Sequence, residues 1–150
     1  GGGRRLSWSS PAHGAAAAAA AAPLDERYAG QVAVLGADVQ RRLLALNYFL
    51  VGAGAIGCEV LKNFAMMGVA CGERGCVHVT DMDIIERSNL SRQFLFRAKD
   101  EKQLKSKTAV SAAQAMNGAL RAKAYAIRVG PETEDHYDAA FYESLDGVCN

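Results

Sequence analysis

The chain has 150 residues, of which 50% are hydrophobic and 22% are charged, and its formal net charge is +1. This length and composition are typical of one globular domain with its own core. The small net charge argues against nucleic-acid binding, and no apolar run reaches the ~20 residues of a membrane-spanning helix.

The first 24 residues differ in composition from the rest of the chain. Three glycines, two arginines and a serine-rich patch precede the alanine run Ala15–Ala22. An isolated helix in water needs ~12–15 residues, so this run is too short to be stable alone. A signal peptide has little support because alanine is only weakly hydrophobic. We expect residues 1–24 to be a disordered low-complexity leader and residues 25–150 to form the folded domain.

Helical and strand patterns alternate along residues 25–150. The spacing of apolar residues predicts helices at 37–46, 56–67, 106–116 and 134–145, and strands at 48–51, 76–80, 123–127 and 147–149. In the second helix the residues expected to face the sheet are Ile56, Val60, Phe64 and Met67. The segment 84–97 has no regular pattern. The order predicts an α/β fold, a Rossmann-like parallel sheet flanked by helices, and the sequence stopping in its fourth strand suggests that the domain is truncated.

A glycine-rich turn joins the first expected strand to the helix after it. Gly52, Gly54 and Gly57 let the backbone bend sharply and approach a phosphate, and the helix N-terminus supplies free N–H groups. This pattern selects nucleotides as a class without specifying which one. The alternative is a tight turn that binds nothing.

Two acidic residues follow the second expected strand. Asp81 stands where a carboxylate can accept hydrogen bonds from both ribose hydroxyls of NAD or ATP, or can simply be a solvated residue at a strand end. Asp83 would point the opposite way if the strand continued, although a loop could turn it back. A surface position is the simpler interpretation of Asp83.

Polar and basic residues suited to a polyphosphate come next. Arg92 offers a planar fork, Lys105 a point charge on a long side chain, and Asn89 an amide donor. We interpret Leu95 and Phe96, with their neighbour Phe94, as core residues that fix the position of the arginine. We interpret the other basic residues of this region as solvated surface charges: Arg97, Lys99, Lys102 and Lys107.

The cysteines give no sign of a metal site or a disulfide framework. The spacing of Cys58, Cys71, Cys76 and Cys149 matches no CxxC pattern and no cysteine–histidine pairing. We expect four free thiols in a reducing compartment.

Four segments together resemble the active adenylation domain of the ubiquitin-activating enzyme family. They are Arg27–Val32, Tyr48–Gly57, Thr80–Asp83 and Ser88–Phe96. The resemblance covers residues 27–150 and implies a ThiF/MoeB-like adenylation fold. In this family an enzyme uses ATP and Mg²⁺ to activate the C-terminal glycine of a modifier protein.

The resemblance also implies roles for particular residues. ATP contacts would fall on the glycine loop with Ala55, on Asp81 for the ribose, and on Asn89, Arg92 and Lys105 for the phosphates. Arg92 and Lys105 would be the catalytic residues, acting by positioning and charge neutralisation. The implied partners are ubiquitin or a related modifier, ubiquitin-conjugating enzymes and an inactive adenylation half of the same chain, without nucleic acid or membrane. The implied location is the cytoplasm and nucleus.

The sequence departs from the family pattern in three ways. Gly30 stands where bacterial relatives carry an arginine that reaches the neighbouring subunit's ATP. The family's Mg²⁺-binding aspartate would follow a few residues after Asn150, and Asp146 does not replace it. No cysteine of this chain matches the family's catalytic cysteine. The chain is therefore expected to hold no metal ligands and to be inactive alone.

Three alternatives stay open at this point. The chain could serve another ubiquitin-like modifier, it could be a nicotinamide-dependent dehydrogenase domain, or it could be a non-catalytic isoform that only binds or competes for partners.

Overall fold

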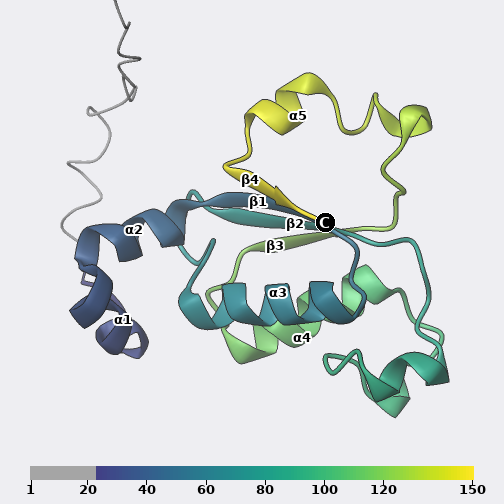
Figure 1. Ribbon diagram of the computed structural model, residues 1–150, viewed down its shortest axis with the longest axis horizontal. Helices are drawn as coiled ribbons and strands as arrows, with labels where there is room; N and C mark the ends of the chain where they lie inside the picture. The colour runs from purple at the N-terminus through teal and green to yellow at the C-terminus, as the bar shows by residue number, and fades with distance from the viewer. Residues whose placement is uncertain (1–22) are drawn as a thin grey trace, which may run out of the picture.

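The computed structural model describes residues 23–150, so the expectation for residues 1–22 lies outside the described part. Four parallel strands form one sheet: β1 (Asn47–Val51), β2 (Cys76–Thr80), β3 (Ala122–Tyr125) and β4 (Gly147–Cys149). Their order across the sheet is β3-β2-β1-β4 (Figure 1). This arrangement confirms the expected parallel α/β fold.

The helices lie on both faces and at one end of this sheet. Figure 1 shows α3 (Ala55–Met67) and α4 (Lys105–Met116) side by side on one face and α5 (Ala139–Glu143) over the other. Helices α1 (Ala29–Leu35) and α2 (Ala37–Ala45) precede β1. Short 3₁₀ turns complete the fold: η2 (Glu26–Tyr28), η3 (Arg87–Ser91), η4 (Ala98–Asp100) and η5 (Pro131–Thr133). Among residues 23–150 no helix has the length and apolar character needed to cross a bilayer.

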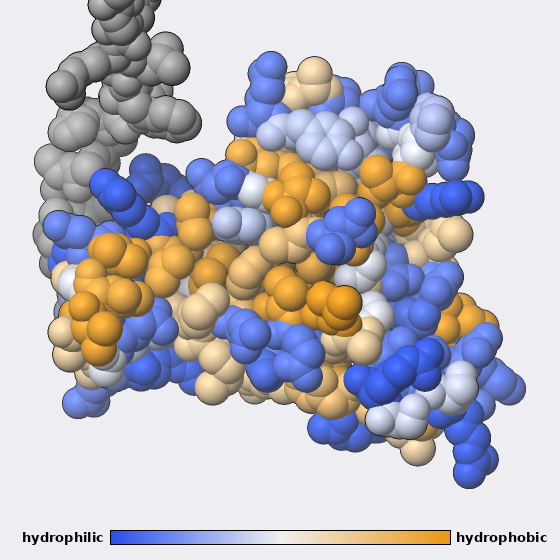
Figure 2. All heavy atoms as spheres, viewed as in Figure 1, coloured by the Kyte–Doolittle hydropathy of each residue, from blue (hydrophilic) through white to orange (hydrophobic). Residues whose placement is uncertain are grey.

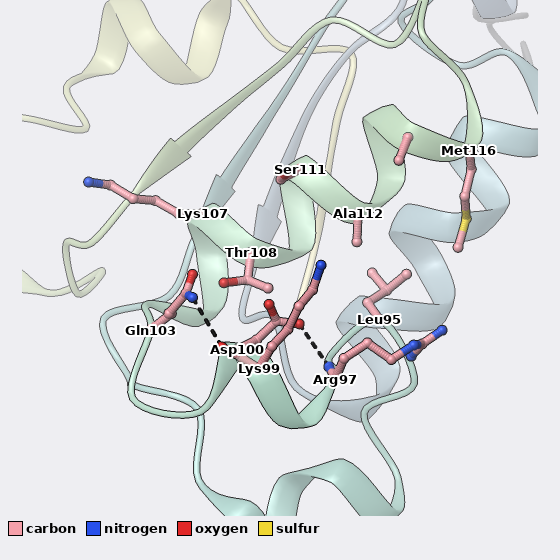
Figure 3. A pocket seen from close by; sticks show the side chains of 11 residues that line it. Leu95, Arg97, Lys99, Asp100, Gln103, Lys107, Thr108, Ser111, Ala112 and Met116 are labelled. Atoms are coloured by element: carbon pink, nitrogen blue, oxygen red, sulfur yellow. Dashed lines mark hydrogen bonds between the residues drawn. The ribbon is translucent and has the colours of Figure 1, made fainter.

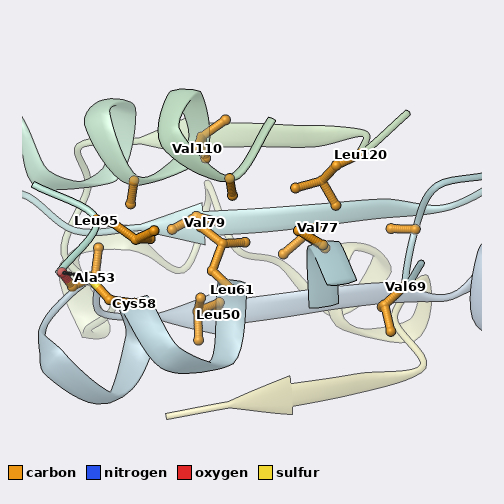
Figure 4. Close-up of a cluster of buried hydrophobic side chains, with 14 of the residues drawn as sticks. Leu50, Ala53, Cys58, Leu61, Val69, Val77, Val79, Leu95, Val110 and Leu120 are labelled. Carbon is orange, nitrogen blue, oxygen red and sulfur yellow. Dashed lines mark hydrogen bonds between the residues drawn. The ribbon is translucent and has the colours of Figure 1, made fainter. Parts of the chain in front are cut away.

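The main core lies between the sheet and the pair α3 and α4 (Figure 4). Side chains alternate along each strand, so Leu50, Val77 and Val79 point towards these helices and are nearly fully buried. Leu95 and Phe96 are 3% and 2% exposed, which confirms that they anchor the segment after η3 in the core.

The side of α3 that packs on the core differs from the expected one. Its buried residues are small or narrow, Gly57, Cys58, Leu61 and Ala65. Ile56 is 76% exposed and Met67 38% exposed, while Val60 and Phe64 lie at the border of the core. The helix is apolar on most of its surface, so spacing alone did not identify the buried side. Close packing against α4 selects the side with the smaller residues.

Two other expectations needed correction. The helix predicted at 134–145 is a 3₁₀ turn and a shorter helix, because buried Tyr137 interrupts it and Asp138 begins α5 with a side-chain cap on the Phe141 N–H at 2.7 Å. Helix α1 was not among the predicted elements; Gly30 within it has low helix propensity. The remaining predicted elements agree with the structure to within about two residues at either end, as is usual for such boundaries.

The opposite face of the sheet carries aromatic residues. Phe49 is fully buried there, and its ring centroid lies 4.9 Å from that of Tyr137 and 5.1 Å from that of Phe141. His78 stacks on Tyr125 at 5.8 Å, and its Nδ1 lies 2.9 Å from the Tyr125 hydroxyl. These contacts hold α5 on the sheet.

Candidate functional site

The loop between β1 and α3 needs glycine at two positions. Gly52 has a φ of 96°, in the left-handed region that favours glycine. A Cβ on Gly57 would lie 2.1 Å from the carbonyl oxygen of Gly52, so the first turn of α3 touches the strand end directly. Gly54 is the N-cap of α3 and provides no side-chain cap, which leaves N–H groups of the first turn without a side-chain partner. The loop has the geometry of a phosphate-binding turn.

A cavity of about 330 Å³ adjoins this loop. It is lined by residues 50–52, 54–57, 60 and 149–150, and so lies at the carboxyl ends of β1 and β4. From β1 the sheet continues to β2 on one side and to β4 on the other, which makes this its topological switch point. Ligands of open parallel sheets bind at such points, so the fold independently places a candidate site at the glycine loop.

Asp81 contacts the same loop from its other side. Its Oδ2 accepts a hydrogen bond from the Ala53 N–H at 2.7 Å, and its Oδ1 accepts one from the Asp83 N–H at 2.9 Å. The Ser106 hydroxyl donates to the Asp81 carbonyl at 3.0 Å. The carboxylate is thus held beside the loop, although Asp81 does not line the cavity.

Lys105 is paired and largely buried. Its ammonium lies 2.8 Å from Asp83 Oδ2, and the two side chains are 11% and 59% exposed. The loop after β2 therefore turns Asp83 back to Lys105, and Asp83 remains at the surface, as the simpler interpretation expected, while it pairs with the lysine. The sequence signal for this ion pair was an Asp-x-Asp spacing followed by a lysine. Whether Asp83 and Lys105 meet, however, depends on where α4 begins.

Asn89 and Arg92 belong to the η3 segment. Asn89 is 6% exposed, and its Oδ1 accepts the Glu86 N–H at 2.9 Å, so its carbonyl oxygen stabilises the turn. Arg92 is exposed and donates to the Ser88 carbonyl oxygen at 3.0 Å. Neither residue lines the cavity at the glycine loop. The structure thus brings Asp81, Asp83 and Lys105 together with the loop, while the contacts of Asn89 and Arg92 lie within their own segment.

Burial lowers the reactivity of three of the four cysteines. All four are free, and burial raises the pKa of the Cys58 thiol to about 11, with smaller opposite effects from groups that include Lys105. Burial also raises the pKa of the Cys71 and Cys76 thiols. A thiol with a raised pKa is a poor nucleophile, so none of these three is assigned as a catalytic cysteine.

A larger cavity of about 590 Å³ lies between η4 and α4 (Figure 3). Arg97, Lys99 and Lys107 stand around it, and Figure 3 shows Lys107 pointing away from the other side chains. Asp100 is tied there to the Arg97 N–H at 2.8 Å. No residue predicted for the site lines this cavity, and it lies away from the strand ends at which nucleotides bind.

A glycine loop at the switch point of a parallel sheet defines a nucleotide-binding α/β domain. The chain belongs to the ThiF family, whose model matches residues 28–150. It is 62% identical over 128 residues to ubiquitin-like modifier-activating enzyme 1 of Dictyostelium discoideum, a match that covers 85% of this chain and 13% of that protein. It is 60% identical over 124 residues to the human protein of that name, covering 83% of this chain and 12% of the relative.

A solved structure shows the same architecture. The E. coli MccB structure determined with ATP is 26% identical to this chain, with a TM-score of 0.65 over 75% of this chain and 34% of MccB. The ThiF/MoeB-like fold expected from the resemblance is confirmed. The chain spans only 12–13% of the length of the two curated relatives.

Proposed function

We propose that this chain forms the ATP-binding part of a ubiquitin-activating enzyme, which adenylates the C-terminal glycine of its modifier. The observation that carries the proposal is the contact of Asp81, which follows β2, with the glycine loop that adjoins the switch point of the sheet. Relatives that are 60% and 62% identical are named modifier-activating enzymes, and the MccB structure was determined with ATP. Both facts favour ATP over a nicotinamide cofactor.

The proposed reaction joins the modifier's terminal carboxylate to the α-phosphorus of ATP, and the bond to pyrophosphate breaks. No protein nucleophile is needed, so the residues of the chain act by binding and by neutralising charge. The free N–H groups at the start of α3 suit a phosphate, together with the loop residues Gly52, Gly54, Ala55 and Gly57.

Asp81 and Arg92 each have hydrogen-bonding groups left over that could contact ATP. Each Asp81 oxygen accepts one backbone N–H and has a second lone pair for a ribose hydroxyl. Arg92 has five N–H donors and uses one on Ser88. We propose that Arg92, Lys105 and the amide of Asn89 contact the phosphates, with Arg92 and Lys105 stabilising the transition state.

Mg²⁺ accompanies ATP in the family that the sequence resembles. Residues 23–150 bring no three His, Cys, Asp or Glu side chains together in a way that could hold a metal ion. We assign no step to the ion.

The proposed partners follow from the same assignment. They are ubiquitin or a ubiquitin-like modifier, a ubiquitin-conjugating enzyme, and an inactive adenylation half in the longer protein. The four free thiols suit a reducing compartment, which supports a cytoplasmic and nuclear location.

Calorimetric titration of the chain with ATP–Mg²⁺ and separately with NADH tests the nucleotide. We expect ATP to bind and NADH to bind more weakly or not at all. Preferential binding of NADH would contradict the proposal and favour the dehydrogenase alternative.

We expect adenylation activity to require segments that the curated relatives have outside the part matched by this chain. A chimera can be made in which residues 28–150 replace the matching segment of the Dictyostelium enzyme. We expect it to catalyse ubiquitin-dependent ATP–pyrophosphate exchange, and a folded chimera that binds ATP without exchange would favour the non-catalytic alternative.

A further inference from the structure

We propose that Asp83 is a positioning residue for the nucleotide site, which holds the Lys105 ammonium in place before ATP arrives. This inference rests on the proposed function, in which Lys105 contacts a phosphate. Asp83 itself is assigned no contact with ATP.

A continuous chain of hydrogen bonds connects Asp83 with the glycine loop. The Ala53 N–H donates to Asp81, the Asp83 N–H donates to the other oxygen of Asp81, and Lys105 Nζ lies 2.8 Å from Asp83 Oδ2. The backbone joins the same groups, because the Lys105 N–H donates to the Asp83 carbonyl oxygen at 2.9 Å. Asp83 thus uses its N–H, its carbonyl and its carboxylate to connect the loop with the lysine.

The unequal burial of the two partners shows which one depends on the other. The Lys105 side chain is 11% exposed, whereas that of Asp83 is 59% exposed. A largely exposed carboxylate is well hydrated without a partner, but a buried ammonium that loses its only ion-pair partner has little water to replace it. The pair therefore determines the position of Lys105 more than it stabilises the fold.

The position of Lys105 in α4 also supports a role in the nucleotide site. It is the first residue of α4, whose first turn contains no acidic residue. A cation at a helix N-terminus interacts unfavourably with the helix dipole, so helix stability does not explain a lysine there. Asp83 offsets this unfavourable interaction and fixes a side chain that otherwise has four rotatable bonds. A phosphate would then meet a cation that has already lost its rotamer freedom.

Lysine acetylation by acetic anhydride, followed by mass spectrometry, tests the positioning without ATP. In the unaltered chain Lys105 should react slowly, and Asp83→Asn should accelerate its modification roughly tenfold. Asp83→Glu, which keeps the carboxylate, should restore part of the protection. The matched control is the exposed pair of Glu59 and Lys62, also 2.8 Å apart, in which Glu59→Gln should leave the reactivity of Lys62 unchanged.

ATP affinity tests the consequence of this positioning. The carboxylate of Asp83 repels a triphosphate, so simple electrostatics predicts that Asp83→Asn binds ATP more tightly. Positioning predicts the opposite, a loss of roughly tenfold in affinity. In chains that already carry Lys105→Met, Asp83→Asn should cause no loss, because the residue acts only through Lys105.

The two measurements separate the failure of this inference from that of the proposed function. If the unaltered chain does not bind ATP but Lys105 becomes reactive in Asp83→Asn, the pairing stands and the nucleotide assignment fails. The positioning role is overturned if Asp83→Asn leaves both Lys105 reactivity and ATP affinity unchanged. It is equally overturned if the loss of affinity persists in the Lys105→Met background, which indicates a purely structural effect.

Discussion

Single residues determine the shape of the glycine loop, and Gly57 is one example. The first turn of α3 touches the end of β1 because Gly57 has no side chain, and the same contact holds the N–H groups of the helix at the mouth of the cavity. At the other side of the loop, the Asp81 carboxylate fixes the Ala53 N–H. Two residues far apart in sequence thus hold one turn from both sides.

Gly57→Ala should destabilise the chain, because its Cβ would lie 2.1 Å from a backbone oxygen that cannot move independently. We expect a loss of about 1–3 kcal/mol in the free energy of unfolding, measured with urea. Gly54→Ala is the matched control in the same loop. It has a φ of −75° and nothing within 4 Å of its Cβ position, so its stability should change by no more than ~0.5 kcal/mol. Equal stability of the two variants would contradict the close contact.

Asp81→Ala and Arg92→Ala should each lower ATP–pyrophosphate exchange in the chimera. Loss of one such contact to the reacting nucleotide costs on the order of 3 kcal/mol in transition-state stabilisation, roughly a hundredfold in rate. Circular dichroism should show that both variants remain folded. Asp135→Ala, which removes an exposed carboxylate between η5 and α5, serves as the control and should retain full exchange. Unaltered exchange in Asp81→Ala or Arg92→Ala would show that the residue has no role in the reaction.

At the scale of elements, the apolar spacing identified the helices and strands but not their packing. The sequence placed a helix at 56–67, yet close contact between α3 and α4 selected the side with Gly57, Cys58, Leu61 and Ala65. In the same way, the sequence predicted one helix at 134–145, but Tyr137 within that range is buried. Its hydroxyl donates to Thr80 Oγ1 at 3.0 Å, and this tertiary contact separates η5 from α5.

Asp138→Ala should weaken the attachment of α5. The Asp138 carboxylate accepts the Phe141 N–H at 2.7 Å, and a helix of five residues has few other stabilising bonds. Removing an N-cap of this kind costs about 1 kcal/mol of stability, which urea unfolding can measure. Asp135→Ala, the same substitution at an exposed neighbouring position, should have little effect. A change no larger than in this control would argue against the cap.

The aromatic face should make stability depend on pH through His78. Burial, with a smaller contribution from the charge of Lys123, lowers the pKa of His78 below 6.5 in the folded chain. The unfolded chain then binds a proton more readily than the folded chain, so stability should decrease as the pH falls through about 6.5 towards the folded-state pKa. His78→Gln should flatten the decrease in unfolding free energy, while His136→Gln, at an exposed position, should not. The same slope in His78→Gln would assign the effect to other groups.

At the scale of the whole molecule, several large apolar side chains are exposed. Figure 2 shows apolar residues gathered at the α1–α2 end of the visible face and across its middle. Those with the most exposed side chains are Val34 at 82%, Ile56 at 76% and Met66 at 60%. The described sheet also has two edge strands, β3 and β4, of which β4 has only three residues. Such surfaces are typical of a domain that packs against other parts of a protein.

The isolated chain should consequently be only marginally stable. We expect an unfolding free energy below about 5 kcal/mol, at the lower limit for natural domains, and concentration-dependent association in analytical ultracentrifugation. The thermal transition should be broad and should begin at a moderate temperature. A sharp, cooperative transition at high temperature from a monomeric chain would contradict this expectation.

The sequence by itself determined the parallel α/β fold, the glycine loop and the position of Asp81 after the second strand. These features depend on local physics: the period of apolar residues and the backbone freedom of glycine in a tight turn. Only the tertiary structure decided the strand order, the cavity between β1 and β4, and the pairing of Asp83 with Lys105. Each of these depends on contacts between segments distant in sequence, which no local pattern records.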